Sequence, residues 1–162
     1  MLVYLIGSLR NPLVPQIAAQ LRAAGYDVFA DWFAAGERAD DALRDYEYSC
    51  GHSFVDALKC SNAMWHVFDF DKKWLDKADI AVLALPAGKS GHLELGYMLG
   101  KGKPGFILLD NEPDRFDVMY LLATGVSATV EDLLTRIRAE IGELRCPLKS
   151  NRRIRADIGG NS

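Results

Sequence analysis

The chain has 162 residues, of which 49% are hydrophobic and 25% are charged, a composition that excludes a disordered protein and fits one globular domain. The net charge of -3 argues against a general nucleic-acid binder, which normally has a basic face, and favours a small-molecule ligand. Three cysteines without a CxxC pair indicate reduced thiols in the cytoplasm rather than a disulfide framework or a thiolate zinc site.

The first predicted element is a strand. Leu2 to Ile6 is an unbroken apolar run that stops at Gly7, the pattern of a strand buried on both faces of a parallel sheet. The run is too short for a signal peptide, and no stretch of the chain is apolar for long enough to cross a membrane. Asn11-Pro12 then offers a cap and a first-position proline for a helix that ends at Gly25. Tyr26 to Phe29 predicts a second strand.

The middle of the chain continues this alternation. The stretch 36–66 is rich in acidic and aromatic residues and predicts one or two helices with a break at Cys50-Gly51. A short helix from Asp71 leads into a buried strand at Asp79 to Leu85. After a glycine-containing loop, His92 to Gly100 has helical periodicity and ends in glycine.

The sequence predicts one domain at 1–146, which contains the helical insert at about 36–66. A basic tail at 147–162 follows, and its composition predicts a flexible segment. The last elements are, in order, a strand at Gly105 to Leu109, a short helix at Met119 to Leu122, an edge strand at Gly125 to Ala128, and a helix from the capping box at Thr129 to about Leu144.

Strands that alternate with helices predict right-handed crossovers. We therefore expect an α/β fold, a doubly wound, flavodoxin/Rossmann-like parallel sheet of five strands with helices on both faces. In such sheets ligands bind beyond the carboxyl ends of the strands, where the strand order reverses. This rule selects the turn after the first strand and the loop after the central strand at Pro86 to Gly91.

Both loops carry groups that bind anions, namely backbone amides, hydroxyl groups and one cation each. Neither loop matches a dinucleotide or triphosphate fingerprint. An ordinary turn explains the first loop equally well and is the commoner explanation of the second. The candidate substrate-binding residues are Gly7, Ser8, Arg10, Gly88, Lys89 and Ser90.

Glu94 is the most notable carboxylate because it follows the central strand, in the first turn of the predicted helix. On position alone, a favourable partner for the helix dipole is the commoner explanation. Asp71 is also a plausible helix cap, and Asp79 is best interpreted as a strand-end residue. His52 and His66 lack ligand-like spacing, so neither a metal nor another cofactor is expected.

Three segments together resemble a known family. They are Tyr4-Leu-Ile-Gly-Ser-Leu-Arg10, Asp71-Lys-Lys-Trp-Leu-Asp-Lys-Ala-Asp79 and Gly91-His-Leu-Glu-Leu-Gly-Tyr-Met-Leu-Gly-Lys-Gly-Lys-Pro104. In order and spacing they are similar to the nucleoside 2-deoxyribosyltransferase family, including its relatives that hydrolyse deoxynucleoside 5′-monophosphates. The Glu-Leu-Gly-Tyr segment followed by Gly-Lys-Pro is the most specific part of this resemblance.

The resemblance implies an enzyme that cleaves a deoxyribosyl N-glycosidic bond and passes the sugar to another base or to water. Glu94 would be the nucleophile and would form a covalent glycosyl-enzyme intermediate. Tyr4 would orient this glutamate, and Asp71 would assist protonation of the leaving base. Ser8, Arg10 and Ser90 would hold the 5′ end of the sugar or its phosphate.

The chain departs from the transferases of the family at Gly88, where they carry a base-recognising aspartate six residues before the nucleophile. Lys89, Ser90 and Arg10 slightly favour a nucleotide over a nucleoside. The resemblance also implies a homodimer or higher homo-oligomer in which the 115–129 segment completes a neighbouring site. No nucleic-acid polymer or membrane partner is expected. Two other functions stay open, a non-catalytic nucleotide-sensing module and a flavodoxin-like scaffold for a protein partner.

Overall fold

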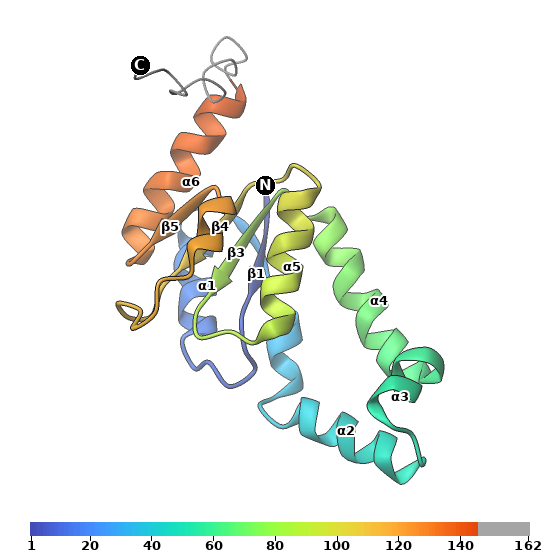
Figure 1. Ribbon diagram of the computed structural model, residues 1–162. Coiled ribbons are helices and arrows are strands. Elements are labelled where there is room, and N and C mark those ends of the chain that lie inside the picture. The colour runs from blue at the N-terminus through green and yellow to red at the C-terminus, as the bar shows by residue number, and fades with distance from the viewer. Residues whose placement is uncertain (146–162) are drawn as a thin grey trace, which may run out of the picture.

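A computed structural model describes residues 1–145, and the predicted tail at 147–162 lies outside the described residues. An all-parallel five-stranded sheet with the order β2-β1-β3-β4-β5 forms the centre of the molecule (Figure 1). The strands are β1 (Leu2–Ile6), β2 (Asp27–Phe29), β3 (Ile80–Ala84), β4 (Gly105–Leu108) and β5 (Gly125–Ser127). The strand order reverses between β1 and β3, so the predicted doubly wound, flavodoxin/Rossmann-like fold is confirmed.

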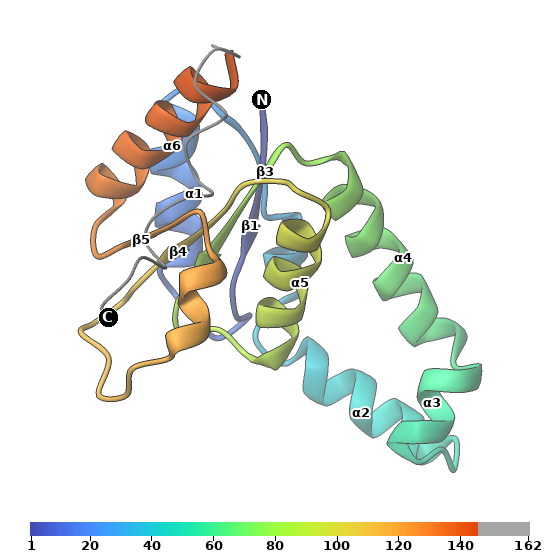
Figure 2. The ribbon, with the colours of Figure 1, turned by 45° about the horizontal axis from the view of Figure 1, so that its top comes forward.

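Helices cover both faces of the sheet (Figure 2). The α1 helix (Val14–Ala23) and the α6 helix (Val130–Arg145) pack on one face, while α4 (Asn62–Lys77) and α5 (Lys89–Gly100) pack on the other. In the described part of the chain, no helix is both long enough and apolar enough to span a bilayer.

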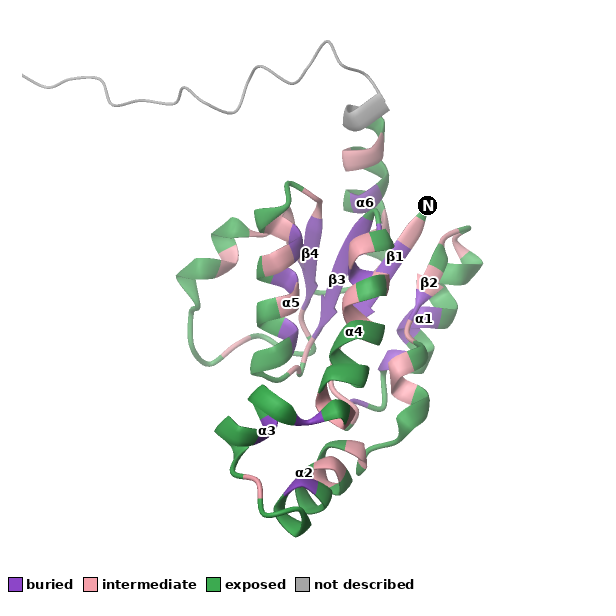
Figure 3. Cartoon of the chain, turned by 90° about the vertical axis from the view of Figure 1, so that its right-hand side faces the viewer, coloured by how far each residue is buried: buried purple, intermediate pink, exposed green. Residues whose placement is uncertain are grey.

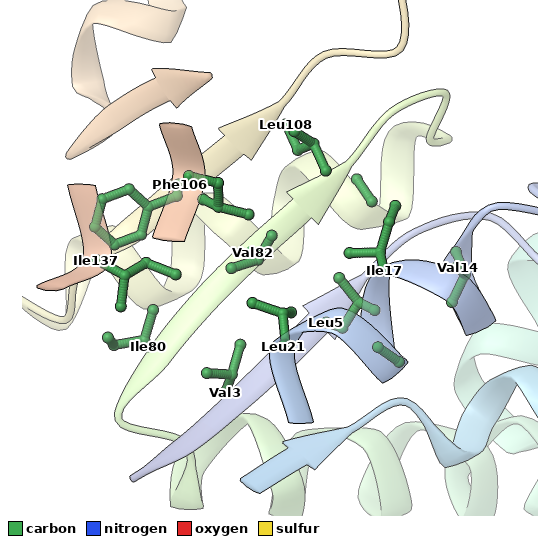
Figure 4. Packing of buried hydrophobic residues seen from close by; sticks show 13 residues of the cluster. Val3, Leu5, Val14, Ile17, Leu21, Ile80, Val82, Phe106, Leu108 and Ile137 are labelled. Carbon is green, nitrogen blue, oxygen red and sulfur yellow. The ribbon is translucent and has the colours of Figure 1, made fainter. Parts of the chain in front are cut away.

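The apolar runs of the strands fill two cores, one on each face of the sheet. Val3 and Leu5 of β1 point into the core under α1 and α6, where they meet Leu21 (Figure 4). Tyr4 and Ile6 alternate with them and point into the core under α4 and α5. Because β1 is buried on both faces, its sequence is continuously apolar. The alternation also fixes Tyr4 on the face that carries α4 and α5.

The segment between β2 and α4 is helical and projects beyond the carboxyl ends of the strands, with mostly exposed residues (Figure 3). It contains the short 3-10 helix η1 (Asp31–Ala35), α2 (Ala39–Ser49) and α3 (Phe54–Cys60). The predicted break is confirmed, since Gly51 between α2 and α3 has a φ of 79°. That left-handed conformation suits glycine because other side chains rarely adopt it.

Several helix starts differ from those predicted. The α4 helix begins at Asn62, after the capping residue Ser61, so Asp71 lies inside this helix and is not its cap. The α1 helix begins at Val14 rather than Pro12, because the Asn11 side chain accepts a hydrogen bond from the Leu13 amide and holds a turn there. The predicted late elements are confirmed as the 3-10 helix η2 (Val118–Leu122), β5 and α6.

Substitution of Gly91 is expected to separate α5 from the sheet. A Cβ at Gly91 would lie 2.9 Å from Ile6 Cγ2 and 3.1 Å from Leu83 Cδ1, whereas a Cβ at Gly96 of the same helix meets no atom within 4 Å. We expect Gly91→Ala to lower the free energy of unfolding by about 1–3 kcal/mol through overpacking. We expect Gly96→Ala to raise it by about 0.5–1 kcal/mol through helix propensity. Urea unfolding of both variants measures the contrast, and equal shifts would contradict it.

Candidate active site

Three ionisable side chains from different elements gather on the face of the sheet under α4 and α5. Tyr4 comes from β1, Asp71 from α4 and Glu94 from α5. Burial, and then the charges of Glu94 and Asp71, raise the pKa of the Tyr4 phenol far above its usual value. The structure therefore brings together the three residues for which the resemblance implies catalytic roles.

Glu94 is a partly buried carboxylate without a cation beside it. Burial, and then the negative charge of Asp71, raise the pKa of Glu94 to about 7. Burial likewise raises the pKa of Asp71 to about 6. Among residues 1–145, neither carboxylate forms a side-chain hydrogen bond or an ion pair. Both groups consequently titrate close to neutral pH, as acid–base catalysts do.

Asp76 shows what a structurally paired carboxylate looks like in the same region. It lies on α4 beyond Asp71, and its oxygens lie 2.6 Å from Lys72 Nζ, Lys101 Nζ and the Tyr97 hydroxyl. Those hydrogen bonds hold the pKa of Asp76 well below its usual range. The contrast shows that the raised pKa of Asp71 is a property of its own surroundings and not of α4 in general.

The helix-dipole explanation of Glu94 is not supported, because the predicted first-turn position is wrong. The α5 helix begins at Lys89, after Gly88 as its N-cap, so Glu94 is in the second turn. The dipole of a helix acts mainly within its first turn. It therefore offers little compensation for a carboxylate that lies deeper along the axis.

Aromatic rings form the apolar wall beside these groups. The Tyr4 ring lies 5.2 Å from the Phe29 ring, which stacks on Trp74 at 4.7 Å and lies 5.8 Å from Phe70. Phe70 and Trp74 are on α4, on either side of Asp71 in sequence. Burial is the cause of the raised pKa of Asp71, and apolar surroundings disfavour the charged form of a carboxyl group.

The loop after β1 is compact, and its polar side chains form a hydrogen bond and an ion pair within the protein. A Cβ at Gly7 would lie 2.8 Å from Val14 Cγ2, so the loop needs glycine there. The Ser8 hydroxyl accepts a hydrogen bond from the Arg10 amide at 3.2 Å. The Arg10 guanidinium pairs with Asp41 of α2 at 2.9 Å. An anion at this loop would compete with Asp41 for Arg10.

The predicted substrate-binding residues after β3, which are Gly88, Lys89 and Ser90, lie on two different sides of α5. Gly88 and Lys89 line a shallow hollow of about 490 Å³, whose other lining residues are Ala87, His92 and Leu93. With 3.6 residues per turn, Lys89 lies about 140° around the helix from Glu94, whereas Ser90 lies only about 40° from it. Helix geometry thus places Ser90 beside Glu94 and directs Lys89 to another face.

The structure also adds residues that the sequence did not single out. Asp41 lies 31 positions from Arg10, and no local spacing signals that contact. Phe70 and Trp74 follow helical spacing, and an α4 helix extended back to Asn62 would have placed them together. Within residues 1–145, no three His, Cys, Asp or Glu side chains are grouped to hold a metal ion.

Comparison with known proteins gives matches among solved structures. A scan against models of protein families finds no match, and no curated protein sequence matches the chain. Among solved structures, the CMP N-glycosidase BcmB of Clostridium botulinum is similar with a TM-score of 0.44 and 13% sequence identity, over 85% of this chain and 99% of that chain. This neighbour of the chain is thus a nucleotide N-glycosidase.

Proposed function

We propose that this protein is a nucleoside 2-deoxyribosyltransferase-like enzyme that cleaves the N-glycosidic bond of a 2′-deoxynucleoside or its 5′-monophosphate. One observation carries the proposal, the gathering of two partly buried carboxylates, Asp71 and Glu94, with pKa values raised to about 6 and about 7. Burying a carboxylate without a cation costs folding free energy. Pairs of this kind, one an acid and one a base, perform glycosidic-bond cleavage.

The reaction needs a nucleophile on one side of the sugar and a proton donor on the other. The Glu94 carboxylate attacks the anomeric carbon, and the electron pair of the carbon–nitrogen bond leaves with the base. The Asp71 carboxyl group donates its proton to that base. The resulting glycosyl–Glu94 ester is then attacked by a second base or by water, with Asp71 as the general base, and two displacements give net retention.

The two carboxyl groups share one proton in the productive form. The pKa values of Asp71 and Glu94, about 6 and about 7, lie close together, so the two singly protonated forms interconvert and share one pH range. The productive form has the proton on Asp71 and leaves the Glu94 carboxylate ionised. A bound base that accepts a hydrogen bond from Asp71 favours the productive form.

Tyr4 fits the role of a positioning residue. Its raised pKa keeps the phenol neutral at any working pH, so it acts only as a hydrogen-bond donor or acceptor toward the charged pair. Its burial in the β1 strand, with the ring against Phe29, fixes where the hydroxyl lies. We propose that it orients the Glu94 carboxylate toward the sugar.

A panel of the common 2′-deoxynucleosides and their 5′-monophosphates tests the proposal, each incubated with and without a second free base. Chromatography of the released or exchanged base is the measurement, with Glu94→Ala as the inactive control. Base release by the wild type and its loss in the variant support the proposal. Tight nucleotide binding without any product, unchanged in Glu94→Gln, would instead identify a sensing module.

The ion pair between Arg10 and Asp41 gives a prediction about substrate choice. If Arg10 binds the 5′-phosphate, Asp41 competes with the substrate, and an exposed pair of this kind contributes up to about 1 kcal/mol. We expect Asp41→Asn to lower the KM for a monophosphate by up to about fivefold and to leave the KM for the nucleoside unchanged. Steady-state kinetics on both substrates measure this difference.

Asp45→Asn is the matched control, because Asp45 is on the same helix but pairs with Arg44 at 2.8 Å. It removes one negative charge from α2 without releasing Arg10. If KM fell equally for both substrates, or if the two variants changed KM equally, Arg10 would not bind the 5′-phosphate.

A further inference from the structure

A second group of ionisable and nucleophilic side chains lies in the α2–α3 segment, outside the Asp71–Glu94 site. Glu47 is on α2 and only 4% exposed, His52 lies in the turn before α3, and Cys60 ends α3. The His52 Nδ1 atom lies 2.7 Å from Glu47 Oε2, and its Nε2 atom lies 3.9 Å from Cys60 Sγ. A carboxylate, an imidazole and a thiol are therefore connected in series.

Glu47 sets the tautomer of the imidazole. Hydrogen bonds from His52 and from the Ser61 hydroxyl lower the pKa of Glu47, so the carboxylate is ionised and can only accept. In the neutral imidazole the shared hydrogen consequently resides on Nδ1 of His52, and the lone pair on Nε2 faces the sulfur of Cys60. This is the order of orienting carboxylate, base and nucleophile that activates thiols in enzymes.

Cys60 is accessible to reagents, because its side chain is exposed. Its Sγ also lies 3.0 Å from the Asp56 carbonyl oxygen, toward which the resting thiol donates. Cys60 is the last residue of α3, and the negative end of a helix dipole disfavours a thiolate there. The imidazole of His52 is thus the group that favours loss of the proton.

Cys50 provides an internal comparison. It is a second exposed free cysteine of the described chain, and its thiol lies beside the Tyr46 hydroxyl. A phenol is not a base at neutral pH, whereas a neutral imidazole is. The two cysteines share the same projecting segment and differ in the group that faces the sulfur.

We propose that Cys60 is a modification site that forms mixed disulfides with low-molecular-weight disulfides, with His52 as the base. His52 Nε2 takes the thiol proton, and Cys60 Sγ attacks one sulfur of the disulfide. A new sulfur–sulfur bond forms as the old one breaks, and the second sulfur leaves with the electron pair as a thiolate. That thiolate takes the proton from the imidazolium, so the disulfide is both oxidant and leaving group.

Two single-thiol proteins test this proposal. Cys50→Ser with Cys146→Ser leaves Cys60 alone, and Cys60→Ser with Cys146→Ser leaves Cys50 alone. Both react near pH 7 with a neutral dithiodipyridine, whose thiopyridone product is followed by absorbance. Because an imidazole nitrogen that can take the proton faces the Cys60 sulfur and only a phenol lies beside Cys50, we expect Cys60 to react about three- to tenfold faster than Cys50.

His52→Asn in the Cys60-only protein removes the base and keeps a side-chain N–H for Glu47. We expect its rate to fall to that of the Cys50-only protein, with an unchanged urea midpoint. Equal rates for Cys50 and Cys60, or a Cys60 rate unaffected by His52→Asn, would overturn the proposal. If His52→Asn unfolds the segment, the comparison of Cys60 with Cys50 decides the matter, since it leaves His52 in place.

Discussion

Glu94→Gln is expected to abolish turnover and at the same time to make the folded protein more stable at alkaline pH. The loss of activity follows from the loss of the nucleophile and should be at least about 10³-fold. Glutamine has nearly the same shape and cannot ionise, so the folded structure should be retained. The two effects together distinguish a catalytic carboxylate from a structural one.

The direction of the stability effect follows from the pKa of Glu94. Its folded-state pKa is raised from 4.5 to about 7, so the folded state binds this proton more tightly than the unfolded state. Stability therefore falls as pH rises through this window, and the full cost is present above about pH 7. Removing the charge should raise the free energy of unfolding by about 2–3 kcal/mol at pH 8, which corresponds to roughly 4–10 °C in Tm. Near pH 4.5 the variant should have almost the same stability as the wild type.

Thermal unfolding followed by circular dichroism across this pH range measures the effect. Asp76→Asn is the matched control, because Asp76 is held by Lys72 and Lys101 with a lowered pKa. A group with a depressed pKa stabilises the fold above its unfolded-state value, so this control should lose stability at neutral pH. A Glu94→Gln protein that is also less stable at pH 8 would mean that Glu94 is a paired structural residue.

Asp71→Asn is expected to lower turnover by about 10²- to 10⁴-fold, the usual contribution of a general acid. In the wild type, kcat/KM should be bell-shaped, with limbs near the pKa values of about 6 and about 7, because only the singly protonated pair is active. The variant should lose the alkaline limb, which reports the proton of the pair. Its remaining acid limb should report Glu94 alone and should lie below the pKa of about 7 that Glu94 has beside the charge of Asp71.

Substrate choice provides the control for this prediction. A deoxynucleoside whose base leaves without protonation does not need the acid, so its turnover should be much less affected by Asp71→Asn. The pH–rate profiles of the wild type and the variant, measured on both kinds of substrate, test this directly. An equal loss on both, with an unchanged profile, would indicate that Asp71 has a structural role or binds the substrate without donating a proton.

The sequence by itself determined the fold class, because each strand and each covering helix has a local pattern. The run from Leu2 to Ile6 is continuously apolar since β1 is buried on both faces, and the alternation of strands and helices requires a parallel sheet. Periodicity does not fix where the helices begin, since the turn held by the Asn11 side chain and the cap at Ser61 depend on side-chain contacts.

Only the tertiary structure decided the surroundings of the candidate residues. Tyr4, Asp71 and Glu94 could be named from sequence segments, but their shared burial, and hence the raised pKa of each, arises from elements that are distant in the chain. The same holds for Arg10, which pairs with Asp41 of α2. Charge interactions and desolvation depend on distances in space, and a linear pattern fixes only which residues are available to meet.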